Sequence, residues 1–129
     1  SNYISGSLKG GEGVERVCNF NESGTKYLKE KMVKYDPEHY SFTNQIIQVG
    51  KTPLDADVSK GEYKIEALTD STSKLSVNVF YRTKPAFLGG LIKGPFKKLT
   101  EAYFVGIIHY ELTGEKVTKK VYKKIKNKY

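Results

Sequence analysis

The stretch 95–113, PFKKLTEAYFVGIIHYELT, is the longest run of this chain with a helical period. Its apolar residues recur at three- and four-residue steps along one helix face: Phe96, Leu99, Tyr103, Gly106, Ile107 and Tyr110. Proline at the first helical position gives up only an amide that would be orphaned anyway, so Pro95 indicates the start. Gly114 indicates the end. The sequence therefore predicts one long C-terminal helix whose apolar face needs a partner.

The segments before this helix alternate apolar and polar residues, as strands of an antiparallel sheet do. The predicted strands are 14–20, 26–35, 40–48, 62–68 and 75–83, joined by turn-rich segments. Residues 4–8 read as the end of an earlier element. The expected fold class is α+β with a helix-grip layout, in which a curved antiparallel β-sheet of at least five strands in meander order wraps on one long C-terminal helix.

A turn at 21–24 closes the first hairpin and fixes its register. This register places Arg16 opposite Glu30 and Cys18 opposite Leu28, all on one face. The face is otherwise apolar, so an ion pair on it has two interpretations. In the first, the two charged groups bond only each other as a half-buried structural pair. In the second, the pair anchors the polar end of a ligand.

We expect a ligand-binding cavity between the inward sheet face and the helix, because both faces are apolar and Gly106 leaves space on the helix. Glu30, with Arg16 opposite, is expected to act as an anchor rather than as a general base. The predicted ligand-binding residues are Arg16, Cys18, Phe20, Leu28, Glu30, Met32, Phe42, Asn44, Ile46, Tyr63, Ile65, Val77, Val79, Tyr81, Leu99, Tyr103, Ile107 and Tyr110.

Other site chemistries find little support in the sequence. The glycine-rich loop 9–13 leads into a strand rather than a helix, which argues against a phosphate cradle. His39 and His109 are far apart, and no cluster of metal-ligand residues accompanies them. Cys18, on the inward face, is expected to be an inert small hydrophobe. We therefore expect no catalytic residue, no metal and no cofactor.

The net charge of +8 is concentrated at the C-terminal end. Residues 115–129 hold seven lysines and one glutamate, which gives +6 for this basic tail. Val117, Val121 and Ile125 repeat every four residues there, which predicts a short amphipathic helix. The aromatic residues share the inward face, so nucleic-acid binding is not expected. We expect at most a peripheral membrane contact through the tail.

Length and cysteine content favour a single cytoplasmic domain. The chain has 129 residues, one cysteine and one methionine, Met32. Because Met32 lies inside the chain, residues preceding Ser1 are expected. The predicted division is a ligand-binding domain over 1–114 followed by the tail 115–129.

An ordered set of residues resembles the START-like (SRPBCC) superfamily, which includes bacterial polyketide cyclase/dehydrase-like proteins and plant pathogenesis-related class-10 and birch-pollen-allergen-like proteins. The set comprises GGEGVER at 10–16, Phe20, KYLKEKM at 26–32, Asp36-Pro37, YSF at 40–42 and GEY at 61–63. Arg16 and Glu30 match positions where bacterial members often carry these residues inside the cavity. The resemblance implies a helix-grip fold with a hydrophobic cavity.

One departure concerns the N-terminus, because that family places a strand and two short helices before the glycine-rich loop. Only about eight residues precede the loop here. The expectation is that the strand and helices are missing. A bare sheet edge would then favour homodimers or exchange of elements.

The expected function is binding of a hydrophobic small molecule (a lipid, isoprenoid or polyketide-like compound) without catalysis. Two alternatives stay open. One is a polyketide cyclase/dehydratase-type enzyme using Glu30 and tyrosines, and the other is an interaction protein that docks through its helix and basic tail. A second apolar strip on the helix (Phe104, Val105, Ile108 and Leu112) suggests a further covering, by the folded-back tail, a second copy or residues outside this sequence.

Overall fold

The computed structural model describes residues 2–6 and 10–129. The chain divides into two compact units, a sheet unit (Ser1–Phe87) and a helical unit (Leu88–Tyr129). The sheet unit contains all the strands, and the helical unit contains both helices. The predicted fold class is confirmed, since an antiparallel meander sheet precedes one long C-terminal helix in an α+β fold.

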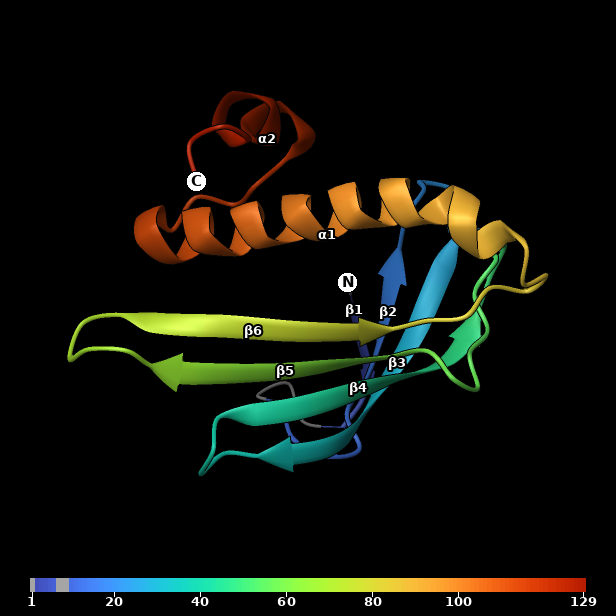
Figure 1. The fold of residues 1–129 in the computed structure, drawn as a ribbon, viewed down its shortest axis with the longest axis horizontal. Helices are drawn as coiled ribbons and strands as arrows, with labels where there is room; N and C mark the ends of the chain where they lie inside the picture. Colours follow the sequence, from blue (N-terminus) through green and yellow to red (C-terminus); the bar gives the residue numbers. More distant parts are fainter. Residues whose placement is uncertain (1, 7–9) are drawn as a thin grey trace. The chain divides into compact units, whose positions relative to one another are not determined.

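The sheet has six antiparallel strands in the order β1-β2-β3-β4-β5-β6. It curves strongly, because β2 and β3 run at a steep angle to β5 and β6 (Figure 1). The strand bounds are Asn2–Ser5 (β1), Glu15–Asn19 (β2), Tyr27–Asp36 (β3), Ser41–Val49 (β4), Lys60–Ala67 (β5) and Ser73–Phe80 (β6).

Strand β1 corrects the expectation that the N-terminal strand is missing. It pairs with β2, with Asn2 opposite Val17 and Ser5 opposite Glu15, so β2 is not a bare edge. The described end of the glycine-rich segment is bonded to β3. Gly13 adopts a positive φ of 85°, and its amide donates to the Met32 carbonyl at 2.7 Å. The turn therefore leads the chain directly into the sheet.

The predicted register of the first hairpin is confirmed, with Arg16 opposite Glu30 and Cys18 opposite Leu28. The ladder between β3 and β4 contains two register shifts that the alternation did not predict, one between Lys29 and Glu30 and one between Met32 and Lys34. Such bulges bend a strand and redirect side chains. The extra residues are Ile47 on β4 and Val33 on β3, so Glu30 and Met32 lie between two irregular points of the ladder.

The segment 50–59 closes one end of the sheet unit around buried polar groups. Asp55 and Ser59 are buried, and the Asp55 amide donates to the Arg82 carbonyl at 2.8 Å. The Lys84 ammonium lies 3.0 Å from the Asp55 carboxylate. This hydrogen bond lowers the pKa of Asp55 and raises the pKa of Lys84. An ion pair thus holds the loop against the segment that follows β6.

Helix α1 (Leu88–Thr113) begins seven residues before the predicted start at Pro95. The predicted start was wrong, because Gly89, Gly90 and Gly94 continue this helix and Pro95 is not its first residue. Pro95 lies inside the helix, where it lacks the amide that would bond to the carbonyl four residues earlier. Among the described residues, no helix is long and apolar enough to cross a membrane.

The C-terminal tail folds back on α1 and contains a short helix, α2 (Lys119–Ile125). The Thr118 side chain caps it by accepting from the Val121 amide. A Cβ added at Gly106 would meet the Val117 Cβ at 3.9 Å, so the tail occupies the space beside Gly106. The expected cavity at Gly106 was therefore wrong, since the returning tail provides the packing that a large side chain would give elsewhere.

A buried histidine fastens this fold-back. His109 is 5% exposed, and its Nε2 lies 3.0 Å from the Glu115 carboxylate while its Nδ1 lies 2.9 Å from the Tyr129 hydroxyl. A carboxylate only accepts, so Nε2 carries a proton. Ile125 is also buried. The helical unit therefore has a small core with a fully bonded histidine.

Candidate functional site

The candidate site lies on the face of β2, β3 and β4 that carries Arg16, Glu30 and Asn44, and the name inward face is kept for this set of side chains. One cross-strand row on this face contains Arg16, Glu30 and Ile46, with Glu30 directly opposite both neighbours. The adjacent row contains Met32 and Asn44. Because these rows are neighbours, three polar side chains are concentrated at the centre of an apolar sheet face.

The Arg16–Glu30 pair is a short, half-buried ion pair. Arg16 Nε donates to Glu30 Oε2 at 2.7 Å, and the two side chains are 24% and 16% exposed. The Cys18 Sγ lies 4.0 Å from the same carboxylate oxygen. Burial, and secondly the Glu30 charge, raises the pKa of the Cys18 thiol. Cys18 is therefore protonated at neutral pH and is a poor nucleophile.

Asn44 is the most buried polar side chain of this face, at 5% exposure. Its carboxamide makes no hydrogen bond to any other residue that the structure describes, whereas each fully enclosed side-chain nitrogen or oxygen in the described chain has a partner. The Asn44 amide therefore borders accessible space. A polar group that enters this space can bond the Asn44 amide, and such a bond contributes about 0.5–1.5 kcal/mol.

On β5, the residue opposite Asn44 is a glycine. Gly61 lies opposite Asn44 and brings no side chain to the face. The Tyr63 ring leans over Gly61, since a Cβ added there would lie 3.0 Å from Tyr63 Cε2. Tyr63 also stacks on Phe42, with ring centroids 4.4 Å apart and planes inclined by 8°. An aromatic wall thus stands beside the Asn44 amide.

The remaining predicted sheet residues share this face at its margins. Val77 pairs with Tyr63, and Ile65 and Val79 are more exposed than the residues at its centre. Leu28 is buried. Phe20 and Tyr81 lie just beyond the ends of β2 and β6, so both predicted strands were one to three residues too long there. The part of the face near β6 is apolar and more exposed to solvent. The centre of the face is polar.

Four predicted residues, Leu99, Tyr103, Ile107 and Tyr110, belong to α1 in the helical unit. They share one helix face, as their spacing predicts. Leu99, Tyr103 and Tyr110 are each about half exposed, whereas Ile107 is less exposed. Their participation in a shared site with the sheet stays a prediction.

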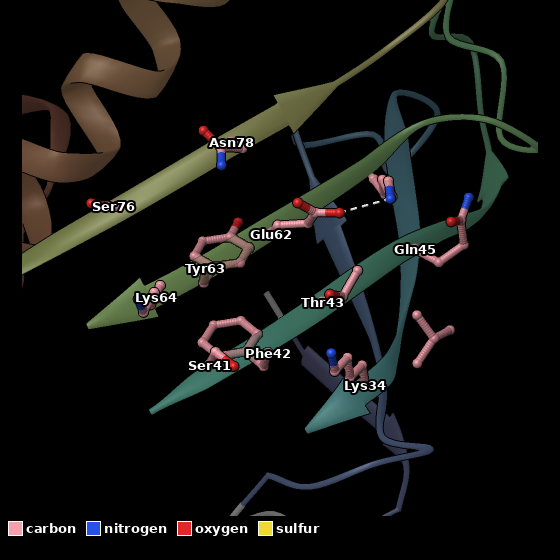
Figure 2. A pocket seen from close by; sticks show the side chains of 12 residues that line it. Lys34, Ser41, Phe42, Thr43, Gln45, Glu62, Tyr63, Lys64, Ser76 and Asn78 are labelled. Atoms are coloured by element: carbon pink, nitrogen blue, oxygen red, sulfur yellow. Dashed lines mark hydrogen bonds and ion pairs between the residues drawn. The ribbon is translucent and has the colours of Figure 1, made fainter. Parts of the chain in front are cut away.

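The outer face of the same sheet carries a shallow hollow of about 600 Å³ that the sequence reasoning did not identify. Figure 2 shows its polar side chains projecting from β3 to β6, with a dashed line at the ion pair that Glu62 forms with Lys60. The lining residues are Val33, Lys34, Ser41, Phe42, Thr43, Gln45, Lys60, Glu62, Tyr63, Lys64, Ser76 and Asn78. Phe42 and Tyr63 alternate with the outer-face residues of their strands, so their rings belong to the inward face. Alternating polar residues signalled this face, and they are typical of the solvated side of an antiparallel sheet.

The described residues were searched for metal ligands and for contacts of the two histidines. No group of three or more His, Cys, Asp or Glu side chains there could hold a metal ion. His39 bonds to Asp36 across a turn at 2.9 Å, while His109 is occupied by the tail. Sequence reasoning missed the His109 contacts, because its partners are brought back by the fold of the tail.

The sequence and the structure were compared with known proteins. No family model, no curated protein and no solved structure matches the chain.

Proposed function

We propose that this protein binds a small molecule with an apolar body and one polar group on the inward face of its sheet. The observation that carries the proposal is Asn44, a buried residue whose amide borders accessible space and has no hydrogen-bond partner among the described residues. Binding sites commonly place a few polar groups among apolar walls to orient a ligand. The resemblance to START-like proteins points to the same class of ligand.

The polar end of the ligand would lie beside Asn44 and the Arg16–Glu30 pair. An amide both donates and accepts, so Asn44 can bond a carboxylate, a hydroxyl or a carbonyl. The Arg16–Glu30 pair, bonded at 2.7 Å, would keep this part of the face polar. The apolar body would cover Tyr63, Ile65 and Val79, and it would gain about 25 cal/mol for each Å² of apolar surface removed from water.

The decisive test is Asn44→Leu, because a binding role and a structural role predict opposite results. Leucine has the same branched shape and number of side-chain heavy atoms, and it removes an amide that lacks a partner among the described residues. We therefore expect the midpoint of thermal unfolding to stay unchanged or to rise. The affinity for laurate, measured by displacement of anilinonaphthalene sulfonate fluorescence, should fall about tenfold, as expected for one lost hydrogen bond of about 1.4 kcal/mol.

The matched control is Thr43→Val, which changes the next residue of β4 on the opposite sheet face. It should leave laurate affinity unchanged. Wild-type protein that binds neither probe would overturn the proposal. A large loss of stability in Asn44→Leu with unchanged laurate affinity would also overturn it, since that result would assign Asn44 to the core alone.

A further inference from the structure

The helical unit carries almost all of the net charge of the protein. Residues 88–129 hold ten lysines, no arginine and three glutamates, for a net charge of +7, whereas residues 1–87 have a net charge of +1. The charge asymmetry thus follows the boundary between the two compact units. A tail that served only for solubility would not need the additional lysines on α1.

The lysines of the tail are exposed because its apolar side chains pack within the helical unit. Ile125 is buried and Val117 packs beside Gly106, while Lys120 and Lys123 are exposed. The contacts of His109 with Glu115 and Tyr129 hold both ends of the tail against α1. The fold-back therefore converts a flexible run of lysines into a fixed basic surface.

Large apolar side chains remain exposed on α1 in the same unit. Leu91 and Leu112 are each 71% exposed, and Leu99 is 52% exposed. Lys93, Lys97 and Lys98 are also exposed on this helix. Exposed leucines and lysines are the side chains that contact the apolar and the charged parts of a membrane interface, and α1 is not apolar enough to span a bilayer.

We infer that the helical unit docks on an anionic membrane surface, with its lysines at the headgroups and the α1 leucines inserted between them. Positive charge is complementary to anionic lipid, and leucine insertion adds a contribution that phosphate contacts alone do not give. Leu91 and Leu112 are more exposed than Tyr103 and Tyr110 on α1, and aliphatic leucines do not stack on bases. Arginine, the usual residue for bidentate base contacts, is absent from this unit. These features favour a lipid surface over nucleic acid.

The test uses co-sedimentation of the full chain with phosphatidylcholine vesicles that contain or lack phosphatidylserine. We expect binding only to the phosphatidylserine vesicles, with affinity falling as salt increases. Substitution of Lys116, Lys120 and Lys123 by Gln should weaken binding at least about tenfold, because each lysine near such a surface contributes about 1 kcal/mol. Leu91→Gln should weaken binding severalfold without a change in net charge.

The control substitutes Lys26, Lys51 and Lys74 by Gln, which removes the same charge from exposed positions of the sheet unit. It should retain vesicle binding. Equal losses in the two triple variants would overturn the inference, since general charge attraction would then explain binding. Tighter binding to a single-stranded RNA than to vesicles at the same salt would also overturn it. Leu91→Gln lies outside the tail, so it tests the docking surface even if the lysine variant disturbs α2.

Discussion

Each face of the sheet offers one ion pair of the same length, and comparing the two shows how a pair that is half buried differs from a pair that is exposed to solvent. Arg16–Glu30 on the inward face and Lys60–Glu62 on the outer face are both 2.7 Å long. The inward side chains are 24% and 16% exposed, whereas the outer ones are 39% and 38% exposed. Equal geometry in unequal surroundings means that desolvation, not distance, determines what each pair contributes.

The largest expected effect concerns stability. Glu30→Ala removes a carboxylate from a half-buried pair, so we expect the free energy of unfolding to fall by about 2 kcal/mol, below the 3–5 kcal/mol typical of fully buried pairs. Glu62→Ala should lower it by less than about 0.5 kcal/mol, as for surface pairs. Urea denaturation of both variants measures the difference, and equal losses would remove the distinction between the faces.

A smaller effect is expected in the reactivity of Cys18. The Glu30 charge contributes, after burial, to the raised pKa of the Cys18 thiol. Glu30→Gln removes this contribution, so the rate of alkylation by iodoacetamide at mildly alkaline pH should rise severalfold. Glu62→Gln is the matched control on the outer face and should leave the rate unaltered. A rate unaffected by both substitutions would mean that burial alone protects the thiol.

The smallest effect is the pH response of the outer face. The hydrogen bond from Lys29, which lies 2.8 Å away, lowers the pKa of Glu15 below its ordinary value of 4.5. A carboxylate with a depressed folded pKa stabilises the fold above its ordinary value, and this contribution is lost as pH falls through the folded pKa. Lys29→Met should therefore reduce stability near neutral pH slightly and flatten the loss of stability below about pH 4.5. Thermal unfolding between neutral and acid pH measures this change, and an unchanged acid limb would contradict it.

Local patterns were sufficient for the parts of the fold that depend on neighbours in sequence. The turn at 21–24 and the alternation of side chains predicted Arg16 opposite Glu30, because a short hairpin loop sets the register of both strands. The same reasoning failed at the α1 start, where glycines that usually interrupt helices continue one. Propensity alone did not decide that segment.

The sequence predicted which sheet face carries the candidate site, but it did not predict how the side chains of the site are arranged. Alternation placed Asn44 on the inward side of β4, yet nothing in the sequence indicated that its amide would lack a protein partner. Asn44 pairs with Met32 between two register shifts of one ladder and with Gly61 in the next ladder. Bulges arise from how strands fit in a curved sheet, so a single-strand pattern does not encode them.

By itself, the sequence determined the strand meander, the long helix, the first hairpin register and the uneven charge, since each follows from local spacing or composition. Only the tertiary structure decided that β1 covers the edge of β2, that Asn44 is buried without a partner, and that the tail returns to His109. These features join residues distant in the chain, and their energies come from burial and from bonds that form only after the chain has folded.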